Sequence, residues 1–464
     1  MNELSSDEKD ILKEAFLEIQ SWVAEKKLTD TGLEFELLVQ GYASFQASYQ
    51  KGGLENFKSS DSLMAGFRLI CKGSSGYAYT ENLSPVALKK CFEQALLNLE
   101  TVSGAGSQQE SFTLFSPAPI VPMDFLFHED LEKHSIEEKL KKAEILEKDA
   151  LAYDPRVSAI AYGGFSHTKS WIRILNSKSL DVFAKFNSMS VSCYPLIKFE
   201  GQNKMAGVNF WTRDWNQLDS HKVARRAAQK SLDYLGAKSL ASKKYHVLFE
   251  NSAASNLFSL ATDFFSAKEV FQKKSILEGK LNQQIFSEQI EIWDDPFLPE
   301  ASGSRPFDDE GAPSHRTCLV ANGVLKNYLT NYEYAQKMQL PHTCNASRSP
   351  SQELEISYSN FVIKKGTQTF EELLQLEEEA LLITEVKGLH AGFNSSTGDF
   401  SFQSVGFLYQ NGKRIHPVEE IVVSGNVLKS FLKVKGLSDR YDHDGSSVLV
   451  PDILVSEIDV AGKG

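Results

Sequence analysis

Three adjacent carboxylates are the most distinctive chemical feature of the sequence: Asp308, Asp309 and Glu310, followed by Gly311. Carboxylate oxygens are the ligands that Mg²⁺ and Ca²⁺ prefer. However, neighbouring side chains in an extended segment point to opposite faces, which keeps the three carboxylates from meeting one ion. We therefore interpret this segment as a structural loop, in which Asp309 or Glu310 accepts hydrogen bonds from nearby backbone amides.

The ten histidines form no ready-made zinc pair, because no two of them lie four or five residues apart. His128 and Glu129 begin like a zincin helix, but Glu132 stands where the second histidine should be. A distant trio could converge only through the fold: His315, His342 and His390. Ordinary surface or hydrogen-bonded histidines are the simpler interpretation of these three.

Motifs for other kinds of catalysis are missing from the sequence. It contains no G-x-S-x-G elbow, no Walker loop and no dinucleotide-binding fingerprint after a strand. The five cysteines are scattered and never spaced as C-x-x-C: Cys71, Cys91, Cys193, Cys318 and Cys344. This usage is typical of small buried side chains in a reducing compartment.

Composition excludes several classes of function. The 464 residues include 49 Lys and Arg and 61 Asp and Glu, which gives a formal net charge of −12. An acidic surface repels phosphate backbones, so we expect no nucleic-acid partner. No apolar run approaches the roughly 18 residues that span a bilayer, so we expect no membrane association. Residues 1–8 lack the basic start and apolar core of a secretory signal, which predicts a cytoplasmic location.

Hydrophobic periodicity predicts an α+β fold, with N-terminal α/β units whose mixed or antiparallel sheet is flanked by helices, and a β-rich C-terminal domain. Helices are expected at 7–26, 85–99, 136–152, 220–235 and 254–265. Strands are expected at 42–49, 65–72, 157–165, 171–175, 180–186, 189–197, 207–212, 245–249, 380–386 and 400–409. Capping boxes begin at Ser135 and Thr369, Asp219 is a helix cap, and Asn411-Gly412 is a hairpin turn.

A stretch rich in Ser and Gly at 101–109, followed by three prolines before residue 123, is the best linker in the chain. We therefore divide the chain into three domains. An N-terminal α+β domain covers 1–115, a central antiparallel-sheet and helix domain covers 116–240, and a β-rich domain covers 241–464.

Short blocks of sequence follow one another in an order typical of a known family. The blocks are 66–69, 76–80 and 83–84 near the N-terminus; 275–281, 294–296, 307–311 and 323–325 in the middle; and 397–401, 411–412, 416–418 and 424–426 near the C-terminus. Each block is short, but together they span nearly the whole chain. In this order and spacing they resemble the TldD/PmbA family of metallopeptidase-related proteins.

The family contains two kinds of subunit. TldD-type subunits hold zinc with a helical His-Glu-x-x-x-His and a late cysteine, whereas TldE/PmbA-type subunits lack this set and pair with the TldD type. By resemblance, the corresponding positions in this chain are Ser259, Leu260, Phe264 and Gly445. Leu, Phe and Gly offer no zinc ligand, and Leu260 also removes the carboxylate that acts as general base. A shift of register does not restore the motif, because no histidine lies between His246 and His315.

The resemblance implies a zinc-free TldE/PmbA-like subunit with no metal and no catalytic residue of its own. A zinc-bearing TldD-like partner would degrade or mature unfolded peptides in the cytoplasm as a heterodimer with this chain, and a homodimer is expected only when the chain is alone. This chain would form part of a peptide chamber and hold an extended peptide on a free strand edge. Its acidity favours basic or neutral peptides. Two alternatives stay open: a self-sufficient metallopeptidase with unusual ligands, and a peptide-binding or regulatory protein without hydrolytic activity.

Overall fold

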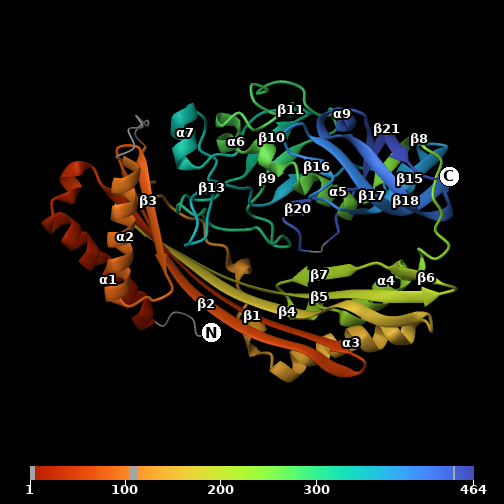
Figure 1. Cartoon of the computed structure of the whole chain (residues 1–464), viewed down its shortest axis with the longest axis horizontal. Coiled ribbons are helices and arrows are strands. Elements are labelled where there is room, and N and C mark those ends of the chain that lie inside the picture. The colour runs from red at the N-terminus through yellow and green to blue at the C-terminus, as the bar shows by residue number, and fades with distance from the viewer. Residues whose placement is uncertain (1–5, 104–111, 443–444, 464) are drawn as a thin grey trace.

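The computed structural model describes residues 6–103, 112–442 and 445–463. Figure 1 shows a long twisted sheet formed by the N-terminal half, with the β-rich C-terminal half stacked above one part of it. Residues 104–109 of the predicted linker lie outside the described residues. No described helix combines the length and the apolar character needed to cross a membrane. The α+β fold class is confirmed.

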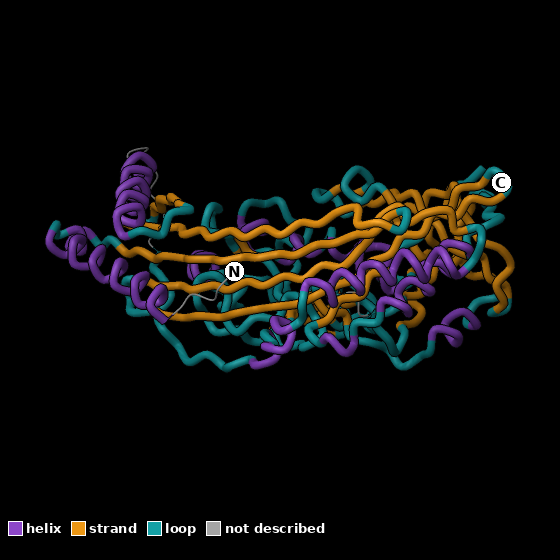
Figure 2. The backbone as a smooth tube through the Cα atoms, turned by 90° about the horizontal axis from the view of Figure 1, so that it is seen from below, coloured by secondary structure: helices purple, strands orange, loops and turns teal. Residues whose placement is uncertain are grey.

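The N-terminal sheet is antiparallel and runs in the order β3-β2-β1-β4-β5-β6, with β7 also paired to β5. Its strands are β1 (Glu34–Gln50), β2 (Gly53–Cys71), β3 (Ser74–Thr80), β4 (Val157–Asn176), β5 (Asp181–Phe199), β6 (Gln202–Met205) and β7 (Val208–Thr212). Strand β1 pairs with β4 from Glu36 opposite Asn176 to Ala47 opposite Phe165. The segments 1–115 and 116–240 therefore contribute to one continuous sheet, whose long strands lie side by side in Figure 2.

These strands are longer than the sequence predicts. The stretches 157–165 and 171–175 both belong to β4, and 180–186 and 189–197 both belong to β5. Polar residues between them suggested turns, but β4 is paired on both sides, with β1 and with β5, so the chain stays extended. Gly163 and Gly164 adopt φ of +129° and +152°, where a Cβ would lie 2.3 and 2.2 Å from carbonyl oxygens of the neighbouring strands. Glycine lets the three strands approach there.

Helices pack at two ends of this sheet (Figure 1). At one end lie α1 (Ser6–Glu25) and α2 (Pro85–Ser103), and at the other lie α3 (Ile136–Tyr153) and α4 (Ser220–Leu232), with short 3₁₀ turns η1 (Leu28–Thr31), η2 (Asp124–Leu126), η3 (Glu129–Lys133) and η4 (Trp215–Gln217) between elements. The rings of Phe16 and Phe92 pack on Phe35 of β1, with centroids 5.4 and 5.1 Å away. The capping box at Ser135 and the Asp219 cap are both confirmed.

The C-terminal half contains two main sheets. The larger is formed by β8 (Lys243–Phe249), β15 (Glu379–Lys387), β16 (Phe393–Asn394), β17 (Asp399–Gln410), β18 (Lys413–Asn426), β19 (Val434–Leu437) and β21 (Ile453–Ala461). Because β15 pairs with both β8 and β17, the order β15-β8-β21-β18-β17 closes into a ring. The turn at Asn411 and Gly412, with φ of +49° and +72°, joins β17 to β18 as the sequence predicts.

The smaller sheet runs β11-β10-β9-β14-β20. Its strands are β9 (Ile292–Asp294), β10 (Thr317–Ala321), β11 (Val324–Leu325), β14 (Phe361–Ile363) and β20 (Val448–Leu449); a separate pair is β12 (Ala346–Ser347) with β13 (Glu355–Ile356). The helices of this half are α5 (Asn251–Ser259), α6 (Ala267–Phe271), α7 (Tyr332–Met338), α8 (Phe370–Gln375) and α9 (Val427–Phe431), with η5 (Thr262–Phe265) after α5. The capping box at Thr369 opens α8 as predicted.

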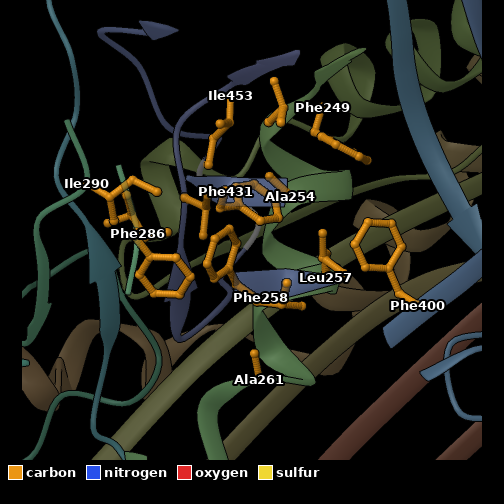
Figure 3. Packing of buried hydrophobic residues seen from close by; sticks show 14 of the residues in the cluster. Phe249, Ala254, Leu257, Phe258, Ala261, Phe286, Ile290, Phe400, Phe431 and Ile453 are labelled. Atoms are coloured by element: carbon orange, nitrogen blue, oxygen red, sulfur yellow. The ribbon is translucent and has the colours of Figure 1, made fainter. Parts of the chain in front are cut away.

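Helix α5 lies at the centre of the largest hydrophobic core. Figure 3 shows its apolar side chains Ala254, Leu257 and Phe258 pointing into a cluster with Phe286 and Phe431. The ring centroids of Phe258 and Phe431 are 4.7 Å apart. This packing holds the apolar face of α5 in place. The polar side chains on the opposite face of the helix therefore have a fixed orientation.

Candidate functional site

The loop 307–311, one of the blocks that carry the family resemblance, is tied to the N-terminal sheet by a buried ion cluster. The guanidinium of Arg68 in β2 lies 3.0 Å from the Glu310 carboxylate, 3.1 Å from that of Glu36 and 3.5 Å from that of Glu333. The Arg68 side chain is 1% exposed. Two of the blocks that carry the family resemblance, 66–69 and 307–311, therefore meet across 242 residues of sequence. A second arginine, Arg348, also approaches Glu36, at 3.0 Å.

Within the loop, the carboxylates accept hydrogen bonds from backbone amides. One oxygen of Asp308 accepts from the amides of Glu310 and Ala312 at 3.0 Å, and the other accepts from Ala346 at 2.9 Å. Asp309 accepts from the amide of Arg348 at 2.8 Å. Asp309 thus bonds to a different segment of the chain from Glu310, which accepts from the amide of Tyr332. Gly311 completes the turn with a φ of +76°.

Three side chains at this cluster have the composition of a cation site: Asp308, Glu310 and His342, whose ligand atoms lie within 4.8 Å of one another. Both Glu310 oxygens already accept hydrogen bonds, from Arg68 and from the Tyr332 amide. Burial and the Glu310 carboxylate raise the pKa of Asp308 to about 7, although backbone donors oppose this shift. Because the Arg68 guanidinium already supplies the positive charge, the arrangement serves as an anchor between the two halves.

The histidine trio does not come together as one set. Burial, and to a smaller extent the charge of His315, lowers the pKa of His342 to about 4. The His342 ring packs against both Phe115 and Tyr332, with centroid distances of 5.6 and 5.3 Å. His390 is exposed in the turn that follows β15.

The positions assigned to the family zinc site lie in three different surroundings. The predicted helix 254–265 is instead two elements, because α5 ends at Ser259, Leu260 is its C-cap, and η5 follows. Phe264 is buried and stacks on Phe393, with centroids 5.9 Å apart. A Cβ added to Gly445 would lie 2.2 Å from the Trp211 side chain. Asp444, from the same stretch of sequence, lies outside the described residues.

The polar face of α5 instead borders a cavity of about 330 Å³ between the two halves of the molecule, which we call the α5 cavity. Its lining residues come from six parts of the chain: Tyr194, Gly207, Val208, Asn209, Arg226, Lys230, Ser252, Ser255, Asn256, Thr384, Glu385, Val386, Asp442 and Ser446. No histidine or cysteine is among these described lining residues. The described lining can therefore hold a polar chain through hydroxyl, amide and charged groups, but it offers no imidazole or thiolate ligand for zinc.

Ion pairs set the electrostatics of the α5 cavity. Arg226 of α4 pairs with Asp442 at 2.9 Å, and Lys230 lies 3.7 Å from Glu250, which immediately precedes α5. Burial raises the pKa of Glu250, and Lys230 partly opposes this shift. The sequence interpretation missed this cavity. A signal was present in the polar spacing of Ser252, Ser255 and Asn256, which places them on one side of a helix.

Strand β7 connects the α5 cavity to a neighbouring cavity. It pairs with β5 only, so its second edge carries no strand partner in the part of the chain that the structure describes. Val208 and Asn209, at its start, line the α5 cavity. Trp211, near its end, lines a second cavity of about 460 Å³. An open edge beside two cavities is a suitable place for an extended peptide.

Comparison with known proteins identifies the family. Three family models match in order: PmbA/TldA metallopeptidase domain 1 over residues 35–99, the central domain over 129–235 and the C-terminal domain over 242–462. The chain belongs to the PmbA/TldD metallopeptidase family. The resemblance inferred from the short sequence blocks is confirmed.

The sequence matches to relatives in this family cover most of the chain. A "Metalloprotease PmbA homolog" of Buchnera aphidicola is 26% identical, over 71% of both chains. The "Metalloprotease PmbA" of Escherichia coli O157:H7 is 23% identical, over 92% of both chains.

Two solved structures share the fold. A Thermotoga maritima protein, solved as a candidate modulator of a DNA gyrase, superposes with a TM-score of 0.87 at 28% identity, covering 97% of this chain and 100% of that one. TldE from Thermococcus kodakarensis superposes with a TM-score of 0.83 at 23% identity, covering 92% and 97% of the two chains.

Proposed function

We propose that this chain is the zinc-free subunit of a cytoplasmic PmbA/TldD-type metallopeptidase, and that it holds unfolded peptides while a zinc-bearing TldD-like partner cleaves them. The α5 cavity carries this proposal. It lies between the two halves of a metallopeptidase-family fold, yet its described lining contains no histidine or cysteine. A wall that binds a peptide but cannot activate water needs a second chain for hydrolysis.

The free edge of β7 supports a peptide as the substrate. Backbone hydrogen bonds to a strand edge do not depend on the sequence of the added strand, which suits an enzyme that accepts many unfolded peptides. The name TldE, carried by the Thermococcus relative, also supports the pairing with a TldD-type subunit. Isolated, the chain forms a homodimer or a monomer in this proposal, and the heterodimer is the active form.

The purified chain provides the first test. We expect mass spectrometry of bound metals to find well under one zinc per chain, and we expect no peptide cleavage by the chain alone. Mixing it with a zinc-loaded TldD-like subunit should produce cleavage that a chelator abolishes. Zinc at one ion per chain, or cleavage by the pure chain, would contradict the proposal.

A variant of the cavity tests whether this chain contributes to peptide binding in the pair. Ser255→Trp places a large side chain in the α5 cavity and should raise the KM for peptide cleavage several-fold. Ser259→Trp, one turn along the same helix and outside the cavity lining, is the matched control and should leave the KM unchanged. Equal effects of the two variants on the KM would show that the α5 cavity does not bind the peptide.

The alternative of a self-sufficient peptidase has one specific observation in its favour, the proximity of Asp308, Glu310 and His342. It predicts cleavage by the chain alone, which a single change at His342 should abolish. A peptide-binding or regulatory role predicts tight peptide binding without turnover, even beside a TldD-like subunit.

A further inference from the structure

Arg213, which directly follows β7, is a buried cation without a buried anion beside it. The residue is 7% exposed. Its Nη1 donates to the carbonyl oxygens of Pro299 and Ala301, at 2.7 and 3.2 Å. Among the described residues, no carboxylate lies within 4 Å of its guanidinium, and its buried Nε has no hydrogen-bond partner. Most buried charges are paired with an opposite charge, whereas the guanidinium of Arg213 lies over the ring of Trp211, with its Cζ 4.5 Å from the ring centroid.

Arg213 lines the second cavity beside β7, of about 460 Å³, which we call the Arg213 cavity. A second arginine, Arg305, also lines it, and the Arg305 Nε likewise has no partner. The remaining lining is rich in hydroxyl groups: Thr168, Ser170, Ser188, Ser302, Ser304, Ser357, Ser359 and Ser447. Ser304 and Ser359 already donate to the Leu298 carbonyl and the Asp294 carboxylate. The other hydroxyl groups, together with guanidinium N–H groups, form the kind of surface that binds a small oxyanion.

The two arginines differ in how their charges are balanced. Arg305 interacts electrostatically with the buried carboxylates of Asp294, Asp308 and Asp309, whose pKa values it lowers against the effect of burial. Arg213 has no such partner, and burial lowers its pKa to about 10. The described residues around the Arg213 cavity therefore leave one positive charge, that of Arg213, without a neutralising carboxylate.

We propose that the Arg213 cavity binds one carboxylate of the peptide held along β7, so that Arg213 determines a preference for peptides with a carboxylate at a fixed place. This inference rests on the proposed function, since it assumes a peptide on the β7 edge. Arginine binds carboxylates through two parallel N–H···O bonds, and burial strengthens these bonds.

The distance between the two cavities fits a short extended peptide. Strand β7 has five residues, from Val208 at the α5 cavity to Thr212 beside Arg213. An extended chain rises about 3.3 Å per residue, so the four steps from Val208 to Thr212 cover about 13 Å. A carboxylate five or six residues from the α5 cavity would thus reach Arg213. The net charge of −12 disfavours acidic peptides in general, so one local cation makes the preference position-specific.

Three peptides of one unstructured sequence test this proposal and separate the two sources of a carboxylate. The first has an amidated C-terminus and no acidic residue, the second has a free C-terminus, and the third is amidated with one internal Asp. Isothermal titration with the purified chain should show that the second or the third peptide binds about tenfold more tightly than the first. The tighter one identifies the source as the C-terminus or the acidic side chain.

Variants of Arg213 test whether this residue causes the difference in affinity between the peptides. Arg213→Gln keeps an amide donor for the Pro299 and Ala301 carbonyls but removes the charge, and should bind the three peptides equally. Arg213→Lys should retain part of the difference. Arg225→Gln, on an exposed face of α4, is the matched control and should keep all of it. Thermal unfolding of each variant verifies that it is folded.

Binding of a small free carboxylate tests the Arg213 cavity independently of peptide binding. N-acetylglycine should raise the unfolding temperature of the wild type but not of Arg213→Gln. If it does so while no peptide binds, the carboxylate site stands and the proposed function fails. If the neutral peptide binds as tightly as the other two and N-acetylglycine has no effect, the proposed function stands and this inference is overturned. If neither binds, both are overturned.

Discussion

At the scale of single residues, Arg68 connects the two halves of the molecule. It is among the largest fully buried side chains, and it joins a strand of the N-terminal sheet to a loop of the C-terminal half. The cost of burying an ion pair makes such pairs a weak source of stability in themselves. Their removal is costly, however, because the partner carboxylates of Glu36 and Glu310 stay buried without a counter-charge.

We therefore expect Arg68→Met to lower the free energy of unfolding by about 3–5 kcal/mol, as measured by urea denaturation. Arg225→Met, an exposed arginine 3.8 Å from Asp149, is the control and should have a much smaller effect. Glu310→Gln combined with Arg68→Met should cost less than the sum of the two single changes. Additive costs would show that the two side chains are not coupled.

At the scale of elements, short pieces of chain are held to the sheet by single charged groups. The 3₁₀ turn η3 is fixed by Glu132, whose carboxylate contacts His167 of β4 at 3.2 Å and Asn187 of β5 at 2.8 Å. Burial alone would raise the pKa of Glu132, but the hydrogen bonds from His167 and Asn187 outweigh burial and lower it to about 2. The ionised carboxylate is thus more stable in the folded chain than in the unfolded one.

The pH dependence follows from this lowered pKa. The stabilisation by Glu132 is present above a pH of about 4.5 and is lost as the pH falls toward about 2, because protons then bind the unfolded state more readily. Glu132→Gln should lower the free energy of unfolding by about 1–3 kcal/mol at pH 7, and the difference from wild type should shrink at pH 3. Glu129→Gln, on the same turn but 68% exposed, should show no such dependence. Urea titrations at the two pH values measure both.

At the scale of the whole molecule, the continuous sheet decides which segments fold together. Strand β1 has β2 on one side and β4 on the other, and β4 comes from the segment after residue 115. The fragment 1–115 would leave the β4-facing edge of β1 open over twelve residues, from Glu36 to Ala47. Long open edges lead to aggregation and not to a stable domain.

We expect the fragment 1–115 to show no cooperative thermal transition, whereas the fragment 1–240, which includes β4 and β5, should recover one. Circular dichroism on heating compares the two fragments. A sharp transition of 1–115 alone would mean that its helices and three strands form an independent core.

The sequence alone determined several local features and the family. The caps at Ser135, Asp219 and Thr369 and the turn at Asn411 depend on neighbouring residues, so they could be predicted before the fold was known. The order of the short family blocks likewise predicted the family, and the absence of histidine between 246 and 315 needed no structure.

Only the tertiary structure decided which distant residues meet. The pairing of β4 with β1 on one side and β5 on the other joined two predicted strands into β4, because hydrogen bonds on both sides keep the polar stretch between them extended. The tertiary structure also brought Arg68 to Glu310 and, among the described residues, left Arg213 without a carboxylate within 4 Å. A sequence lists charges but not their separations or their burial, and the energy of a charge depends on both.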